Sequence, residues 1–315
     1  MQDPAIVLLN PVAGQGRAAA LRRPIEQWLA KRMPQVPLLA PSSADAALAT
    51  LMVIAPRTRV VVVGGDGSVQ AMLPAFLRCG HRLGLLPAGT NNHLARALGV
   101  HGVGWPKALA YALKAAVAPL DIGQVQTEDD TAHFVASLHA GFDAQVAARL
   151  QRAPRLLRGL PRRLWTVPAA WLQHAPTEAR IWVNGELEYE GRLSSANVLN
   201  APTPGTSLPA HAIAAEPRFD DGRLDALVVP ALGLWSVLRL LAGHPAHPAS
   251  LYQLCGQKLV IDAGRPLALA ADGDPLAPAS RLTVQVLPRA LYAAGRHAAR
   301  PRRSSASATT LPPLR

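Results

Sequence analysis

Three glycine-containing loops near the start of the chain could hold a phosphate group. The loop at residues 64–68 reads GGDGS, and the loops NPVAGQGR and PAGTNNH occupy residues 10–17 and 87–93. Glycine lets backbone N–H groups come close to phosphate oxygens, and the N-terminus of a helix adds a favourable dipole. Each loop alone is a weak signal, because turns between strands and helices often contain glycine. Their occurrence together in one half of the chain predicts a phosphate-bearing ligand.

Asp66 stands among the glycines of the GGDGS loop, where its carboxylate would repel a phosphate. A divalent cation or a reacting hydroxyl lying between the two groups would remove this conflict. The alternative is that Asp66 caps the helix that follows the loop, since Asp is a favoured capping residue. The sequence leaves both roles open.

Further carboxylates lie in turns of the second half. A DDG turn occupies residues 220–222, a DGD turn occupies residues 272–274, and Asp121 lies between the two halves in the sequence DIGQV. Asp and Gly are ordinary turn residues, so either turn alone is typical of a simple connection between strands.

The elements that must position the three loops alternate between strand and helix patterns. The apolar runs AIVLL, VVVV and LGLL are typical of buried strands, and a loop and a helical pattern follow each of them. This order predicts βαβ units, and ligands bind beyond the carboxyl ends of such strands. We therefore expect residues 1–122 to form an α/β domain with a Rossmann-like parallel sheet that binds a phosphate-bearing ligand, and the family resemblance given below implies that this ligand is a nucleotide.

The second half contains mostly strand-like segments. Asn184-Gly185 between two alternating segments is typical of a tight hairpin. We expect residues 123–288 to form an all-β antiparallel sandwich or barrel, and residues 289–297 are candidates to rejoin the first domain. Few helical patterns interrupt these strands, chiefly around residues 158–173 and 234–242.

Two basic segments account for the net charge of +12. Six arginines and no acid lie between Asp143 and Glu178, and six more arginines follow from Arg289 to the end. Such segments favour an anionic partner, either a membrane surface or nucleic acid, whereas the alternative is a solvated face. Residues 298–315 have the composition of a disordered basic tail. No signal-peptide pattern or apolar run of about 20 residues is present, so we expect a cytoplasmic protein.

Taken in order, the motifs NP…GR, GGDGS, LPAGTNN, DIG, DDGRLD and DGD resemble the diacylglycerol kinase catalytic-domain family. This family includes bacterial diacylglycerol kinases, YegS-like lipid kinases and sphingosine kinases, and the resemblance runs from Ala5 to Pro288. It implies a two-domain fold similar to NAD kinases and phosphofructokinases, with ATP in the interdomain cleft. The implied reaction transfers the γ-phosphate of ATP to the hydroxyl of a lipid such as diacylglycerol.

The resemblance implies roles for individual residues. Asp274 matches the position of a catalytic glutamate that accepts the proton of the lipid hydroxyl, and Asp66 orients that hydroxyl or binds metal. The implied nucleotide-binding residues are Asn10, Gly14, Gly64, Gly65, Asp66, Gly67, Ser68, Gln70, Gly89, Thr90 and Asn92.

The resemblance also implies a Mg²⁺ site in the second half. Asp221 matches a magnesium-binding acid, and the backbone carbonyls of Arg218 and Arg223 occupy the accompanying positions. Asp121 is a further candidate ligand for this ion.

The chain departs from the family pattern at two acidic positions, which Ala71 and His93 occupy here. Asp274 is one methylene shorter than the usual glutamate, and Ser68 replaces a threonine. Two alternatives therefore stay open: a non-catalytic lipid- or nucleotide-binding module on the same fold, and an NAD kinase-like enzyme.

A lipid substrate lies in a bilayer, so the resemblance favours a role for the first basic segment in membrane docking. We expect peripheral binding at the anionic inner membrane surface and no nucleic-acid partner. The sequence leaves the oligomeric state open, with a homodimer as one option.

Overall fold

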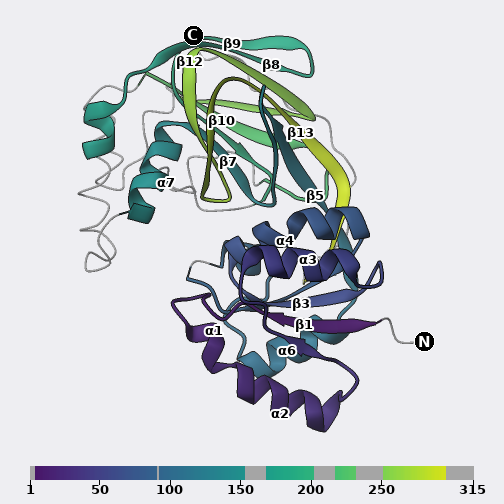
Figure 1. Ribbon diagram of the computed structural model, residues 1–315. Coiled ribbons are helices and arrows are strands. Elements are labelled where there is room, and N and C mark those ends of the chain that lie inside the picture. Colours follow the sequence, from purple (N-terminus) through teal and green to yellow (C-terminus); the bar gives the residue numbers. More distant parts are fainter. Residues whose placement is uncertain (1–3, 91, 153–167, 202–216, 232–250, 296–315) are drawn as a thin grey trace.

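The computed structural model describes residues 4–90, 92–152, 168–201, 217–231 and 251–295, which form two packed halves (Figure 1). The elements of the first half are β1 (Ala5–Leu9), α1 (Arg17–Ala20), α2 (Arg22–Arg32), β2 (Leu38–Leu39), α3 (Ala44–Val53), β3 (Arg59–Gly64), α4 (Asp66–Cys79), β4 (Arg82–Pro87), α5 (His93–Ala97) and α6 (Trp105–Lys114).

The first half is a parallel sheet with helices on both faces. The strands pair in the order β2–β1–β3–β4, and all of these pairs are parallel. The four valines of β3 are fully buried and alternate between two cores. Val60 and Val62 pack with residues of α3 and α4, while Val61 and Val63 pack with α2 and α6. A strand buried on both faces needs such an unbroken apolar run.

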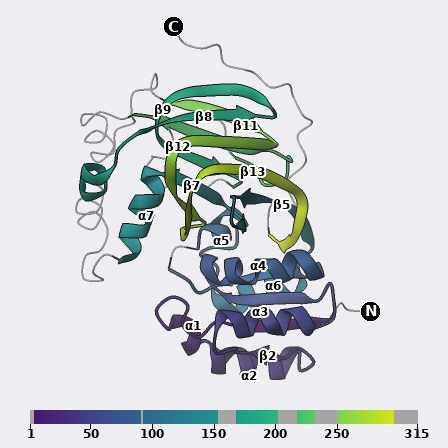
Figure 2. The same ribbon diagram turned by 45° about the horizontal axis from the view of Figure 1, so that its top comes forward.

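The second half is mainly antiparallel (Figure 2). The β8–β9 hairpin turns at Asn184 and Gly185, which have positive φ angles of 52° and 98° as a tight hairpin turn requires. The elements of this half are β5 (Val117–Gln126), β6 (Thr131–Phe134), β7 (Ser137–Gly141), α7 (Phe142–Arg152), β8 (Thr177–Val183), β9 (Glu186–Leu199), β10 (Leu224–Pro230), β11 (Tyr252–Gly256), β12 (Lys258–Ala271) and β13 (Asp274–Ala294).

Two expectations need correction. The strands form one connected sheet in which the parallel strands continue into a mainly antiparallel assembly, so a Rossmann-like sheet describes at most β1–β4. The second half is not all-β, because α7 packs against β7, β9 and β12. Three further expectations fall wholly or mostly outside the described residues. These are most of the helix expected around residues 158–173, the whole helix expected around 234–242, and the tail at 298–315.

The two halves share the strands β5 and β13. β13 pairs with β12 and β5, and its end then pairs in parallel with β4, where Tyr292 lies opposite Arg82. Between these parts the register shifts, and Arg289 adopts a φ of 56°. The carboxylate of Asp121 holds this bend, since it accepts the N–H of Arg289 at 2.8 Å and the N–H of Gly222 at 2.6 Å.

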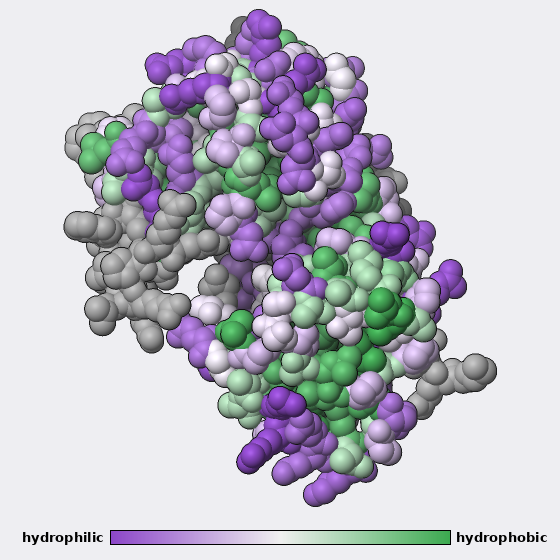
Figure 3. Space-filling view, viewed as in Figure 1, coloured by the Kyte–Doolittle hydropathy of each residue, from purple (hydrophilic) through white to green (hydrophobic). Residues whose placement is uncertain are grey.

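The surface differs between the halves. The visible face of the second half is largely hydrophilic, whereas apolar residues are more frequent over the first half (Figure 3). Within the part of the chain that the structure describes, no helix is long and apolar enough to cross a bilayer.

Candidate active site

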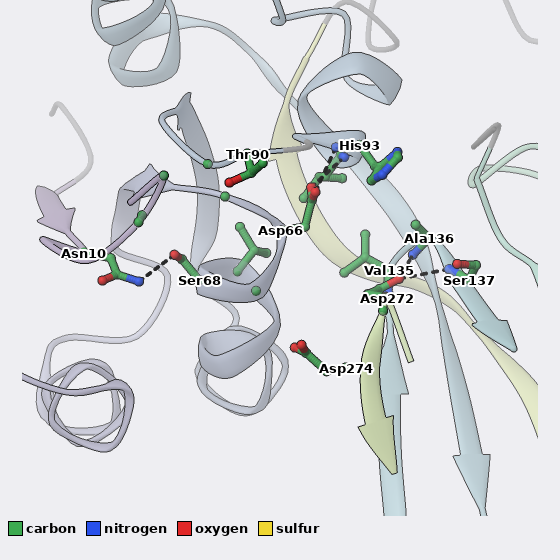
Figure 4. Close-up of a pocket in the computed structure, with 18 of the residues that line it drawn as sticks. Asn10, Asp66, Ser68, Thr90, His93, Val135, Ala136, Ser137, Asp272 and Asp274 are labelled. Atoms are coloured by element: carbon green, nitrogen blue, oxygen red, sulfur yellow. Dashed lines mark hydrogen bonds between the residues drawn. The ribbon is translucent and has the colours of Figure 1, made fainter. Parts of the chain in front are cut away.

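A cavity of about 400 Å³ lies where the two halves meet (Figure 4). Its volume falls in the range of small-molecule sites. One wall comes from the loops after β1, β3 and β4, and the other comes from residues 135–139 and the turn between β12 and β13. The predicted site residues that line it are Asn10, Gly14, Gly65, Asp66, Gly67, Ser68, Gly89, Thr90 and Asp274.

Most of the loop glycines are needed because the loops touch one another. A Cβ added to Gly65 would lie 2.8 Å from the Cα of Gly89, and one added to Gly89 would lie 2.4 Å from the Cα of Gly65. Gly14 has a φ of 61°, and its Cβ would lie 2.1 Å from the carbonyl oxygen of Ala88. At Gly67 the nearest atom, Oδ2 of Asp274, would be 3.8 Å away. Gly67 is therefore the glycine whose open side faces the cavity.

Side chains fix the three loops in place. Asn10 donates from Nδ2 to Oγ of Ser68 at 2.8 Å, which joins the first loop to the second. Arg17 donates from Nη2 to the carbonyl of Gly89 at 3.0 Å, which joins the first loop to the third. Asn92 closes the third loop, because its amide accepts the N–H of Gly89 and donates to the carbonyl of the same residue. The polar atoms of Asn92 are thus bonded within the loop, and Asn92 does not line the cavity.

Asp66 caps a helix, although not the one that follows it directly. Its Oδ2 accepts the N–H of His93 and its Oδ1 accepts the N–H of Leu94, both at 2.9 Å (Figure 4). The carboxylate therefore fixes the start of α5 and joins the second loop to the third. The sequence predicts a cap on the helix that follows the loop, which is α4. The carboxylate of Asp66 instead caps α5, whose first donor, His93, lies 27 residues later in the chain.

Asp272 is a site residue that sequence reasoning passed over as turn chemistry. Its Oδ2 accepts the N–H of Val135 at 2.7 Å, and its Oδ1 accepts the N–H groups of Ala136 and Ser137 at 2.8 and 2.9 Å. Burial raises the pKa of Asp272 to about 6, with a further contribution from Asp66, even though the three N–H groups act in the opposite direction. Asp272 thus ties the β12–β13 turn to the start of β7.

Asp274 extends from the same turn toward the start of α4 (Figure 4). Partial burial raises the pKa of its carboxyl above the ordinary value. A carboxylate at this place faces the N-terminus of α4, whose first N–H groups precede the intrahelical bonds and carry the positive end of the helix dipole. The arrangement can hold a phosphate on one wall and remove a proton on the other.

Comparison with known proteins agrees with this geometry. Residues 4–125 match the diacylglycerol kinase catalytic domain, and residues 136–294 match the YegS C-terminal NAD kinase beta sandwich-like domain. The chain belongs to the diacylglycerol kinase and YegS-like lipid kinase family.

Individual relatives and solved structures are similar to most of the chain. A diacylglycerol kinase of Mycobacterium tuberculosis is 28% identical over 237 residues, which cover 74% of this chain and 75% of that protein. The crystal structure of a diacylglycerol kinase from Bacillus anthracis has a TM-score of 0.70 at 19% identity, with 94% of this chain and 98% of that one covered. An NAD kinase from Archaeoglobus fulgidus in complex with ATP has a TM-score of 0.53 at 15% identity, with 92% and 93% covered. The likeness to both structures shows the shared two-domain fold.

The two departures from the diacylglycerol kinase pattern differ in their surroundings. Ala71 lies on α4 and does not line the cavity, whereas His93 does. Burial lowers the pKa of His93, Arg96 and His139 lower it further, and Asp66 acts against them. The ring is therefore neutral near pH 7 and supplies no negative charge where the family usually carries an acid.

Other predicted residues lie outside the cavity lining. Gly64 ends β3, and Gln70 donates to the carbonyl of His133 on β6 instead of facing the cavity.

The residues predicted to bind Mg²⁺ also lie away from the cavity. Oδ1 of Asp221 accepts the N–H of Arg223 at 3.1 Å, and the side chain of Arg218 pairs with Asp220. Burial raises the pKa of both Asp121 and Asp221, and Asp121 adds to the rise at Asp221. Within the described residues, no three His, Cys, Asp or Glu side chains converge in a way that could hold a metal.

Proposed function

We propose that this protein is an ATP-dependent lipid kinase, which transfers the γ-phosphoryl group of ATP to the hydroxyl of a lipid such as diacylglycerol. The observation that carries the proposal is the pairing of walls in one cavity. Phosphate-type loops line the first wall, and the carboxylate of Asp274 faces them from the second. Phosphoryl transfer needs positioning and charge stabilisation more than covalent chemistry, and this pairing supplies both.

The first wall binds the phosphates through the backbone. Gly67 leaves room for a phosphate oxygen beside the start of α4, a helix of 14 residues with its dipole aimed at the cavity. Thr90 is exposed at the cavity and offers a hydroxyl, while the hydroxyl of Ser68 accepts from Asn10. Asp66, Asn92 and Arg17 act indirectly, because they hold the loops in register.

The second wall removes the proton. Asp274 accepts the proton of the lipid hydroxyl while the hydroxyl oxygen attacks the γ-phosphorus. The raised pKa of Asp274 makes it a stronger base than an ordinary carboxylate. Asp272 keeps the turn in place through its three backbone bonds and does not itself need to reach the substrate.

The loop at residues 218–223 offers a divalent cation one carboxylate and backbone carbonyls, because no three acidic side chains of the described residues converge there. Three carboxylates, Asp121, Asp220 and Asp221, interact unfavourably there, and a cation would relieve this repulsion. Asp221 and the carbonyls of Arg218 and Arg223 would hold it. A Mg²⁺ ion there would stabilise this loop and the neighbouring bend at Asp121. It would lie outside the cavity lining, so its contribution would be structural.

The test is transfer of radiolabelled phosphate from ATP across a panel of lipids, with NAD included as an acceptor. We expect Mg²⁺-dependent labelling of a hydroxyl-bearing lipid and no labelling of NAD. Labelling of NAD alone would instead support the NAD kinase-like alternative. ATP or lipid binding without any transfer would support the non-catalytic module.

We also propose that the first basic segment docks the protein on an anionic membrane. Residues 153–167 of this segment lie outside the described structure, so the proposal rests on the sequence. Each basic residue near an anionic surface contributes about 1 kcal/mol, so changing Arg158, Arg162 and Arg163 to Gln should weaken vesicle binding roughly 100-fold.

Sedimentation with phosphatidylglycerol-containing vesicles at low salt measures this effect. Replacement of three exposed arginines of α2 by Gln is the matched control, because it removes the same charge from a helix of the first half (Figure 1). An equal loss of vesicle binding in both triple variants would mean that binding depends on the net charge of the protein and not on the first basic segment. The control arginines are Arg22, Arg23 and Arg32.

A further inference from the structure

One face of α4 joins the two halves of the molecule beside the cavity. Gly67 and Gln70 lie three residues apart on this helix, and residues at this spacing share a helix face. A Cβ built on Gly67 would lie 3.8 Å from Oδ2 of Asp274. Gln70, about one turn further along, donates from Nε2 to the carbonyl oxygen of His133 on β6. The same helix face therefore meets the proposed base and is bonded to the second half.

The acceptor of this bond lies on an open strand edge. Among the described strands β6 pairs only with β5, and α4 contacts β6. A carbonyl oxygen can only accept a hydrogen bond, so the amide nitrogen of Gln70 must be the atom that faces it. The amide oxygen of Gln70 is buried and has no hydrogen-bond partner among the described residues. Within this part of the chain, the side chain of Gln70 thus makes a single hydrogen bond, and that bond crosses between the halves.

The helix itself is weakened at the same residue. Pro74 lies inside α4 and has no N–H, so the intrahelical bond from residue 74 to the carbonyl of Gln70 cannot form. The first turn of α4, which carries Gly67, is therefore joined to the rest of the helix by one bond fewer than usual. The side chain of Gln70 attaches this turn to the second half instead.

The strand that receives the bond is fixed to the sheet by its own side chains. Nε2 of His133 lies 3.1 Å from Nε2 of Gln124 on β5, and Oε1 of Gln124 accepts from Nε2 of Gln285 on β13 at 2.7 Å. These three side chains cross the neighbouring strands β6, β5 and β13 in one row. The partner of Gln70 is therefore tied to the two strands that the halves share.

A short path leads from this bond to the proposed base. His133 stands two residues before the start of residues 135–137, whose N–H groups donate to Asp272 at 2.7 to 2.9 Å. Asp274 follows in the same turn and points toward the start of α4 (Figure 4). Loss of the Gln70 bond would let the second wall move away from α4 while the hydrogen bonds within each wall stay intact.

We propose that Gln70 is a positioning residue, which sets the distance between the carboxylate of Asp274 and the phosphate-binding start of α4. Aspartate has one methylene less than glutamate, so a small increase in this distance takes its carboxylate out of hydrogen-bond reach of the acceptor hydroxyl. A misplacement of about 1 Å can lower the rate by roughly 10²-fold. Gln70 itself lies outside the cavity lining and acts through the backbone of β6. This inference rests on the proposed kinase function.

A longer base tests this role. Gln70→Met keeps the length and helix propensity of the side chain but cannot donate a hydrogen bond, so kcat for lipid phosphorylation should fall about tenfold. The ATP affinity should stay the same, because the loops of the first wall are unaltered. Asp274→Glu extends the base by one methylene, so it should raise kcat about threefold or more in the Gln70→Met protein. In the wild-type background, where the distance already suits Asp274, the same change should not raise kcat.

Controls separate positioning from stability. Gln27→Met makes the same substitution at an exposed residue of α2, and it should leave kcat unchanged. Thermal unfolding of every variant gives the folded fraction, and kcat is expressed per folded molecule. Gln70→Glu is a second variant with the same shape and no N–H, and we expect the same dependence on the base from it. A purely stabilising role of Gln70 would lower Tm without making kcat depend on the length of the base.

The outcomes also separate this inference from the kinase proposal. An unchanged kcat in Gln70→Met, or the same factor from Asp274→Glu in both backgrounds, would overturn the positioning role and leave the kinase activity intact. A wild-type protein that labels no lipid of the panel would overturn both.

Discussion

The two walls of the cavity use different parts of the chain for their chemistry. The first wall, from the N-terminal half, presents backbone groups, and its side chains mainly hold three loops against one another. The second wall presents side chains, namely Asp274, Ser137 and His139, on strands that are hydrogen-bonded within the sheet. Function of the first wall should therefore be most sensitive to substitutions that add side-chain atoms to its glycines. Function of the second wall should be most sensitive to substitutions that remove a polar group from its side chains.

Removal of the carboxylate on the second wall should have the largest effect. Asp274→Asn keeps the size of the side chain but cannot accept a proton, so kcat should fall about 10²–10⁴-fold, while ATP affinity changes little. Steady-state kinetics and calorimetric titration with ATP measure the two quantities. Asp262→Asn, on β12 and outside the cavity lining, is the control. A kcat within threefold of wild type would show that Asp274 is not the base.

The next largest effect concerns stability and pH. The pKa of Asp272 is about 6 in the folded protein and 3.8 as the reference for the unfolded chain, so the folded state binds the proton more tightly. Its contribution to stability is therefore fully present below pH 4 and is lost as the pH rises through 6. A gap of about two pH units corresponds to roughly 3 kcal/mol as an upper value, because Asp272 lines the cavity and the residue is only partly shielded from solvent.

Urea unfolding of wild type and Asp272→Asn between pH 4 and pH 7 isolates this contribution. The difference in free energy of unfolding between the two proteins should change across pH 4–6, with the wild type losing stability relative to the variant. Parallel pH curves would mean that Asp272 titrates alike in both states.

Additions to the first wall should have the smallest effects, and these should be of two kinds. Gly67→Val meets little protein but occupies the space of a phosphate oxygen, so ATP should bind about tenfold more weakly, a loss of about 1.4 kcal/mol, at an unchanged Tm. Gly65→Ala instead forces a Cβ against Gly89, so it should lower stability by about 1–3 kcal/mol. Thermal unfolding and ATP titration of both variants distinguish them. If both variants changed Tm and ATP affinity alike, Gly67 would not face the ligand while Gly65 serves loop packing.

The sequence predicted the parts of this site that depend on local pattern. The valine run of β3, the strand–loop–helix order around it and the DGD turn all follow from residue type and spacing. Partners that are distant in sequence could not be predicted. Nothing near Asp66 indicates that its carboxylate receives the N–H groups of His93 and Leu94, and nothing near Asp272 indicates three donors at residues 135–137. Both contacts exist because tertiary packing brings separate loops together.

The shared strand β13 has a consequence for how the protein is made. Arg82 on β4 pairs with Tyr292, more than two hundred residues later, so the outer edge of the N-terminal sheet is closed only by the last described strand. During synthesis the first half emerges before β13, with an open strand edge, and such edges invite pairing with other chains. Long-range pairings of this kind also slow folding. The ribosome must therefore deliver β13 before the first half can complete its own sheet.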